Sequence, residues 1–137
     1  MTKTITLLDG GLGQELIKRS TAPPHPLWST HVMMTEPELV SAVHRDFCEA
    51  GARVICLNTY AVSRFRLNTY VPDESLENML ALSHRVAAAG IEAANCSVPV
   101  SVVASLPPLP AAYDHTVAPN PDSAYEQYQE LIQLQKH

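Results

Sequence analysis

The chain has 137 residues, is 46% hydrophobic, and carries a formal net charge of −5 from 9 basic and 14 acidic side chains. This is enough apolar material for one folded domain and excludes a disordered segment. Acids and bases are interspersed and no apolar run approaches the roughly 20 residues of a membrane span, so we expect neither nucleic acid nor a membrane as partner. The N-terminal stretch lacks the features of a secretory signal, which predicts a cytoplasmic protein.

Short β-branched, apolar stretches alternate with helical patterns along the chain. The predicted strands are residues 4–8, 52–60 and 98–106. The predicted helices run from about 35 to 50, from about 73 to 95, and from about 122 to the end. We expect Thr35 to cap the first of these helices and Gly51 to end it, with Gly90 a tolerated weak point in the second. The alternation predicts an α/β protein with a parallel sheet.

The first turn, "LLDGGLGQE" (residues 7–15), holds three of the five glycines of the chain. In one interpretation Asp9 caps the helix that follows and the glycines supply positive φ angles. In another, the backbone N–H groups of the turn bind phosphate, as in a flavodoxin-like domain. The spacing matches neither GxGxxG nor GxxxxGK[ST], and the turn contains no lysine, so the phosphate interpretation is disfavoured.

The ends of the predicted strands carry the residues that are candidates for a site. Asp9 follows the first strand, "NTY" (residues 58–60) closes the second, and "ASLPP" (residues 104–108) closes the third. Ligands of parallel α/β folds bind at the carboxyl ends of the strands. We therefore expect all three segments at one rim.

The cysteines and histidines give no metal-binding pattern. Cys48, Cys56 and Cys96 are an odd number, are widely spaced and include no CxxC, so we expect buried free thiols rather than a disulfide framework. The histidines form no HExxH motif, and His44 and His84 fall in helical patterns where packing or surface roles are expected.

Several motifs in fixed order resemble a known family. "LLDGGLGQEL" is followed by "PLWS", "PEL" and "HRDFCEAGARVICLNTYAVS". This order strongly resembles the N-terminal portion of the homocysteine S-methyltransferase family, in which a DGGxGTE-like turn precedes PLWS, a PEL helix and a HxxYxxAGAxxIxTNTYxAS run. The chain departs from the family at Gln14 and Leu57, where the family has threonines, and in "ASLPPLP", which lacks the glycines of a GSxGPxG-like loop.

The resemblance implies a zinc enzyme on a TIM (β/α)₈ barrel that transfers a methyl group to the thiol of homocysteine, giving methionine. Zinc would convert the thiol to a thiolate nucleophile. The family's methyl donors are S-methylmethionine, S-adenosylmethionine, betaine or a methylated folate. Since a full barrel takes about 250 residues, residues 1–137 correspond to a partial barrel of roughly three βα units, one domain incomplete at its C-terminus.

The resemblance also implies roles for individual residues. It implies that Asp9 holds the homocysteine ammonium and that Gly10 and Gly11 allow close approach of the backbone. The segment of the family that lines the substrate pocket corresponds to Asn58, Thr59 and Tyr60. Trp28 is either an anchor that closes the barrel or an aromatic that faces a methylated cation, and the first is favoured.

The zinc ligands of the family, one cysteine in an NC motif and two in a GGCC motif, have no counterparts here. Cys96 follows an asparagine but falls at the end of a helix, so we expect no metal ligand and no catalytic residue in this chain. We expect a truncated homocysteine S-methyltransferase that is inactive alone.

The alternative is a non-catalytic α/β module that keeps an amino-acid-binding rim or serves in assembly. The coding sequence after His137 would distinguish the two. Strands left without neighbours would also expose apolar residues, for which we expect Val54, Ile55, Val102 and Val103, and would promote self-association.

Overall fold

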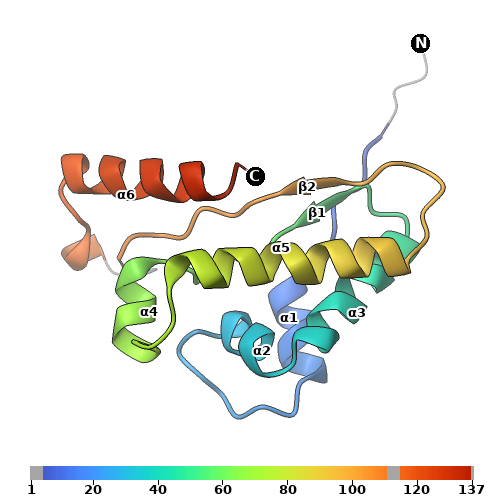
Figure 1. Ribbon diagram of the computed structural model, residues 1–137, viewed down its shortest axis with the longest axis horizontal. Coiled ribbons are helices and arrows are strands. Elements are labelled where there is room, and N and C mark those ends of the chain that lie inside the picture. The colour runs from blue at the N-terminus through green and yellow to red at the C-terminus, as the bar shows by residue number, and fades with distance from the viewer. Residues whose placement is uncertain (1–4, 111–114, 137) are drawn as a thin grey trace.

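A computed structural model describes residues 5–110 and 115–136 (Figure 1). Its elements, in chain order, are α1 (Leu12–Arg19), α2 (Ser29–Thr35), α3 (Pro37–Glu49), β1 (Val54–Cys56), α4 (Arg64–Tyr70), α5 (Leu76–Ala93), β2 (Ser101–Val103), the 3₁₀ turn η1 (His115–Val117) and α6 (Pro121–Leu134). Among the described residues, no helix is both long and apolar enough to cross a bilayer.

The sheet is small and parallel, which confirms the predicted α/β class. Ile55 of β1 lies opposite Val102 of β2, and α4 and α5 connect the two strands. The predicted strand at residues 4–8 is wrong as a strand, because in its described part only Leu8 pairs, in one parallel bridge to Val54. Thr4 lies outside the described residues. β1 therefore lies between the segment around Leu8 and β2.

The helix predicted from about residue 35 to 50 corresponds to α3, and a separate helix, α2, ends where it was expected to begin. Thr35 is the last residue of α2, and its hydroxyl donates to the carbonyl of His31 (3.1 Å), so Thr35 does not cap α3. α3 begins at Pro37, whose fixed φ suits the first helical position. Gly51 ends α3 as predicted, with a φ of +107°. The sequence analysis missed α2 and α4 as separate helices.

Gly90 is a close contact rather than a weak point. It lies on the side of α5 that packs against α3, and α5 runs beside α3 beneath the strands (Figure 1). A Cβ at this position would lie 2.7 Å from the Cβ of His44 and would also overlap the carbonyl of Ser41. The absence of a side chain therefore sets how closely the two helices approach.

Two clusters of apolar side chains form the core. The larger joins residues of α1, α2, α3, α4 and α5 with Leu131 of α6, and its fully buried members include Leu16, Leu27, Met33, Val40, Val43, Leu67 and Leu80. The smaller lies between the sheet and the helices and is made of Cys48, Ala52, Ile55, Leu57 and Ala87. Ile55 is fully buried there, so the expectation that it is uncovered is wrong.

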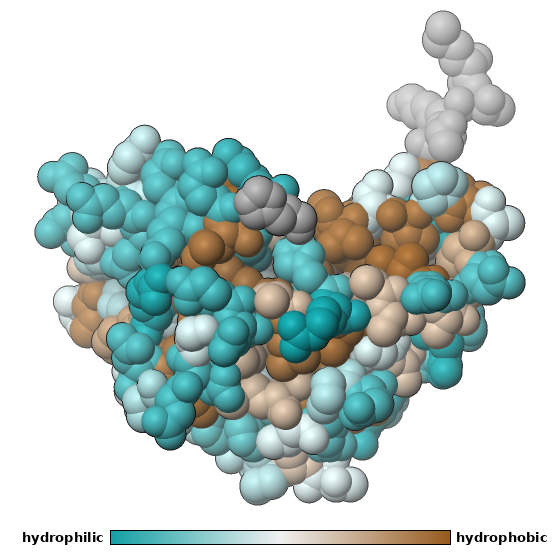
Figure 2. Space-filling model, viewed as in Figure 1, coloured by the Kyte–Doolittle hydropathy of each residue, from teal (hydrophilic) through white to brown (hydrophobic). Residues whose placement is uncertain are grey.

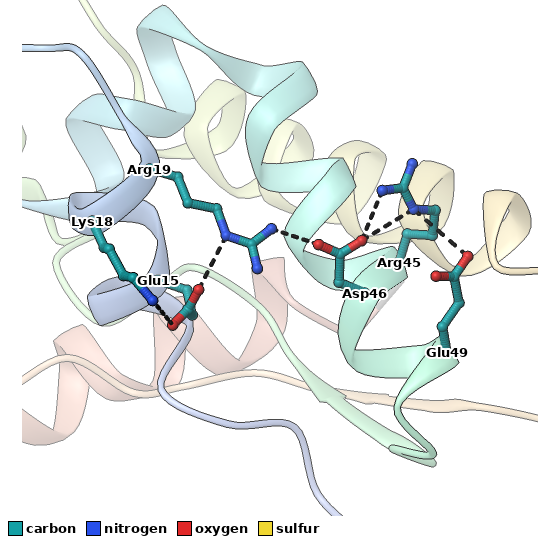
Figure 3. Close-up of polar contacts among 6 residues, drawn as sticks. All are labelled: Glu15, Lys18, Arg19, Arg45, Asp46 and Glu49. Atoms are coloured by element: carbon teal, nitrogen blue, oxygen red, sulfur yellow. Dashed lines mark hydrogen bonds and ion pairs between the residues drawn. The ribbon is translucent and has the colours of Figure 1, made fainter.

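A chain of ion pairs joins α1 to α3 on the surface (Figure 3). Asp46 accepts hydrogen bonds from Arg19 of α1 and from Arg45 of its own helix. Arg19 also donates to Glu15 (3.0 Å). The hydrogen bond from Arg19, followed by that from Arg45, lowers the pKa of Asp46. These groups are solvent-exposed, so the pairs fix the relative orientation of α1 and α3 more than they add stability.

Candidate functional site

Asp9 lies where the first segment leaves β1. Its backbone N–H donates to the carbonyl of Val54 (2.9 Å), and its carboxylate then accepts the backbone N–H of Cys56 (2.8 Å). The side chain thus continues the pairing with β1 after the backbone has turned away. Asp9 does not cap α1, because Gly11 occupies the N-cap position and no side chain bonds to the end of that helix.

None of the three glycines of the first turn has a positive φ, and only Gly10 makes a close approach. Of the five glycines, all within the described residues, only Gly51 has a positive φ. A Cβ on Gly10 would lie 2.8 Å from a ring carbon of Phe47 in α3, whereas one on Gly11 would meet only ordinary contacts. Gly10 therefore allows the turn to lie against α3.

Asn58 is buried and fixed by Ser29, the serine of "PLWS". The amide nitrogen of Asn58 donates to the Ser29 carbonyl (2.9 Å), and the Ser29 hydroxyl donates to the Asn58 amide oxygen (2.8 Å). Only 4% of Asn58 is exposed. This reciprocal pair holds the start of α2 against the loop that follows β1, so two of the sequence motifs meet in space.

Thr59 joins the loops that follow β1 and β2. Its hydroxyl donates to the carbonyl of Ser105 (2.8 Å) and accepts the Ser105 N–H (3.0 Å). Thr59 is fully buried, and its side chain does not line the adjoining cavity. Its observed role is to hold the rim together.

A cavity of about 280 Å³ opens at this rim. Its lining includes Gly10, Trp28, Ser29, Cys56, Asn58, Tyr60 and Ser105. The cavity therefore brings together three segments: the turn after Leu8, the loop after β1 and the loop after β2. This is the arrangement predicted from the strand ends. Of the predicted substrate-binding residues, Gly10, Asn58 and Tyr60 line it, while Asp9, Gly11 and Thr59 lie beside it.

Trp28 stands at the edge of the cavity in an unusual backbone conformation. It has a φ of +53°, and 53% of its surface is exposed. It also lines a neighbouring cavity of about 440 Å³ under the proline-rich loop. Trp28 therefore borders two open cavities, and its predicted role as an anchor that closes the barrel stays a prediction.

Two titratable groups near Asp9 are held neutral. Burial, followed by hydrogen bonding with the Asp9 carboxylate, raises the pKa of the Cys56 thiol to about 11. Burial lowers the pKa of His44 to about 4, against a smaller opposing effect of the Asp9 charge. Around neutral pH Cys56 is therefore a thiol and His44 a neutral imidazole, so neither adds a charge beside Asp9.

The sequence analysis missed Ser29, Cys56 and Ser105 as lining residues. Both serines had a signal, since Ser29 belongs to the "PLWS" motif and Ser105 to "ASLPP", which closes the third predicted strand. Cys56 was expected to be a buried thiol. In the structure only Cys48 is buried, while Cys56 and Cys96 are partly exposed.

The described residues do not fit a metal centre. No three histidine, cysteine, aspartate or glutamate side chains among them gather in an arrangement that would hold a metal ion. Cys56 lines the cavity, but Cys48 and Cys96 pack in the smaller core cluster. The zinc implied by the family resemblance thus lacks a ligand set in this part of the chain.

Comparison with known proteins assigns the family. The family model for homocysteine S-methyltransferase matches residues 6–137. The chain belongs to the homocysteine S-methyltransferase family. This membership confirms the resemblance drawn from the first-turn, "PLWS" and "NTY" motifs, and it does not support a flavodoxin-like domain.

Individual members of the family show the same relationship. Homocysteine S-methyltransferase 3 of Zea mays and selenocysteine Se-methyltransferase of Brassica oleracea var. italica are each 35% identical over 83 residues, 59% of this chain and 24% of theirs. The crystal structure of the metallated homocysteine methyltransferase MmuM from Escherichia coli superposes with a TM-score of 0.68 at 26% identity, over 78% of this chain and 39% of that one. The chain spans about a quarter of the length of these curated relatives.

Proposed function

We propose that this chain is the N-terminal part of a homocysteine S-methyltransferase barrel domain, a partial TIM (β/α)₈ barrel of roughly three βα units, and that it supplies a homocysteine-binding rim. The observation that carries the proposal is the meeting of Gly10, Asn58 and Ser105 at one cavity beside the Asp9 carboxylate. The match of the family model over residues 6–137 supports it. We also propose a cytoplasmic location, in line with the expectation from the sequence.

Asp9 would bind the ammonium group of homocysteine. A carboxylate has about four lone-pair positions, so the bond from the Cys56 N–H leaves acceptor capacity for a second donor. Hydrogen bonds between charged partners are stronger than neutral ones, and a fixed amino group would direct the rest of the substrate along the cavity. The bond to Cys56 also holds the carboxylate in one orientation before substrate binds.

Methyl transfer itself would need groups that the described residues do not offer. In the family, zinc supplies the activation of the homocysteine thiol, and no ligand cluster for it is present here. Cys56 does not substitute as a nucleophile, because its raised pKa keeps it protonated. We therefore expect the 137-residue chain alone to bind the amino acid end of homocysteine without methylating it from S-methylmethionine, S-adenosylmethionine, betaine or a methylated folate.

Nuclear magnetic resonance titration of the chain with homocysteine tests this proposal. We expect the amide signals of Gly10, Asn58 and Ser105 to shift. A matched ligand, 4-mercaptobutanoic acid, has the thiol and the carboxylate but no amine and should shift them much less. Equal shifts with both ligands, or none with either, would refute the ammonium-binding role.

The alternative of a non-catalytic module is tested by the same segment in a longer chain. We would join residues 1–137 to a C-terminal part that carries the NC and GGCC motifs and assay methyl transfer to homocysteine. Activity that depends on Asp9 supports the transferase. Homocysteine binding without transfer in that chain would favour a module that only retains the rim.

A further inference from the structure

Two cysteines far apart in sequence, Cys48 and Cys96, lie together in the smaller core cluster. Cys48 is in the last turn of α3, and Cys96 follows α5. Asn95 adopts a φ of +46° directly after that helix, and this left-handed turn brings Cys96 back toward α3. The Cys96 thiol then lies 3.9 Å from the carbonyl oxygen of Cys48, to which it donates.

A cation lies against this pair. The Nη1 atom of Arg53 is 4.0 Å from the sulfur of Cys96 and 3.2 Å from the carbonyl oxygen of Cys48, and it is fixed by a third bond to the Ala52 carbonyl (2.7 Å). The guanidinium thus places a positive charge beside the sulfur atom that would react. Cys96 is also partly exposed, whereas Cys48 is buried. Cys96 is therefore the thiol that a reagent from solvent meets first.

Cys48 and Cys56 differ from Cys96 in burial, in pKa or in position. Burial raises the pKa of Cys48, and the neighbouring Cys96 thiol adds to this effect, which shows that the two thiols interact. Cys56 is not in this cluster. It lines the rim cavity, and its pKa is raised to about 11. The chain thus contains an attacking thiol, a buried partner beside it, and a third cysteine that serves as an unreactive reference.

We propose that Cys48 and Cys96 form a redox pair that closes to an intrachain disulfide on exposure to a hydroperoxide. In the first step the Cys96 sulfur, having given its proton to solvent, attacks the peroxide, the O–O bond breaks, and Cys96 becomes a sulfenic acid. The leaving oxygen takes up a proton from solvent and departs as an alcohol or, from hydrogen peroxide, as water. In the second, the sulfur of Cys48 attacks that of Cys96, the S–S bond forms, and the S–O bond breaks. Water leaves with the Cys48 proton. The two thiols supply the two electrons that reduce the peroxide.

The disulfide would tie the end of α3 to the turn after α5, where the chain enters the approach to β2. It would add a covalent link beside Arg53, next to the start of β1, whereas Cys56, which lines the cavity, ends β1. The pair is independent of the substrate-binding role proposed for the rim.

Peptide mapping after oxidation tests the proposal. The reduced chain would be treated with one equivalent of hydrogen peroxide and digested with trypsin without reductant. Trypsin places the three cysteines in separate peptides, residues 46–53, 54–64 and 86–136. We expect a chain lighter by two hydrogen atoms, with the first and third peptides linked. Links through Cys56, or links only between two chains, would overturn the proposal.

Variants separate a redox pair from general oxidation. Cys56→Ser should form the same link, whereas Cys96→Ser and Cys48→Ala should form none, and circular dichroism checks that each remains folded. Arg53→Met keeps the length of the side chain without its charge and should slow the first step by about threefold to tenfold. A link that forms at an unchanged rate in Arg53→Met would refute the role given to the guanidinium.

Discussion

The bond of Asp9 to β1 is observed and its binding role is proposed, and a single substitution separates the two. Asparagine keeps an oxygen that accepts the Cys56 N–H, so Asp9→Asn should leave the melting temperature nearly unchanged. It removes the charge that would pair with the homocysteine ammonium. We expect homocysteine binding to weaken by about 1.5–3 kcal/mol, the range for a hydrogen bond to a charged group. Calorimetric titration measures the effect.

The matched control for Asp9→Asn is Asp122→Asn. Asp122 is an exposed acid in the first turn of α6, so its substitution removes the same charge far from the rim in sequence. Homocysteine affinity that falls equally in both variants would indicate a general electrostatic effect. Unchanged affinity in Asp9→Asn would leave Asp9 as a turn residue only.

His44 makes the stability of the chain depend on pH. It is fully buried, and neither ring nitrogen has a hydrogen-bond partner. Its pKa is lowered to about 4, whereas an unfolded histidine titrates near its usual 6.5. As pH falls below about 6.5 the unfolded chain takes up a proton that the folded chain does not. Stability therefore falls from neutral pH toward pH 4, by about 3 kcal/mol in all.

Urea unfolding at about pH 7 and about pH 5 measures this loss of stability. Both pH values lie above the range where most carboxylates titrate, so the difference between them reports mainly on histidine. His44→Leu should remove most of the difference between the two curves. A smaller difference should remain, because burial, with a contribution from His31, also lowers the pKa of His25. An equal loss of stability in the parent and His44→Leu chains would show that His44 is not the titrating group.

At the scale of elements, the packing of α3 on α5 depends on Gly90. The Cβ of alanine would meet the Cβ of His44 at 2.7 Å and the backbone of α3 beside it, neither of which is the end of a flexible side chain. Although alanine is the better helix former, we expect Gly90→Ala to destabilise the chain by about 1–3 kcal/mol through overpacking. Gly13→Ala is the control, since Gly13 also lies within a helix and its Cβ would meet the Ser29 side chain only at 3.4 Å. Equal stability of the two variants in urea would contradict this account.

The elements also show what the sequence could predict and what it could not. Apolar stretches located β1 and β2, and helical periodicity located α3, α5 and α6, because these patterns are local. The segment before Asp9 reads as a strand, yet only Leu8 pairs, since the Asp9 side chain takes over the bonding to β1. α2 was missed because Thr35 and Pro37 resemble one helix start, and nothing local shows that a helix ends between them.

The candidate site also has features that the sequence predicted and features that it could not show. Placing Asp9 and Asn58 at one rim followed from the rule for strand ends and from the family motifs. The bonds of Asn58 to Ser29 and of Thr59 to Ser105 join residues 29 and 46 positions apart, and only the folded chain shows them. The contact of Gly10 with Phe47 likewise became visible only once α3 was placed.

At the scale of the whole molecule, the sheet leaves apolar surface uncovered. Val102 and Val103 of β2 are 43% and 41% exposed, and Leu7 and Leu8 at the other side of the sheet are more than half exposed. Figure 2 shows apolar side chains gathered in the hollow between α6 and the N-terminal segment. Within the described residues β2 pairs only with β1, so its other edge is unpaired. An open edge beside an apolar surface is a template for association.

We therefore expect the purified chain to self-associate, with a weight-average mass in sedimentation that rises with concentration. Val102→Lys places a charge on the exposed edge strand and should reduce association. The control is Tyr125→Lys, which places the same charge at a side chain of α6 that is 66% exposed. If both variants reduce association equally, net charge rather than the strand edge is responsible. A parent chain that sediments as a monomer at every concentration would show that the exposed sheet does not pair, and the uncovered strands would then have no part in assembly.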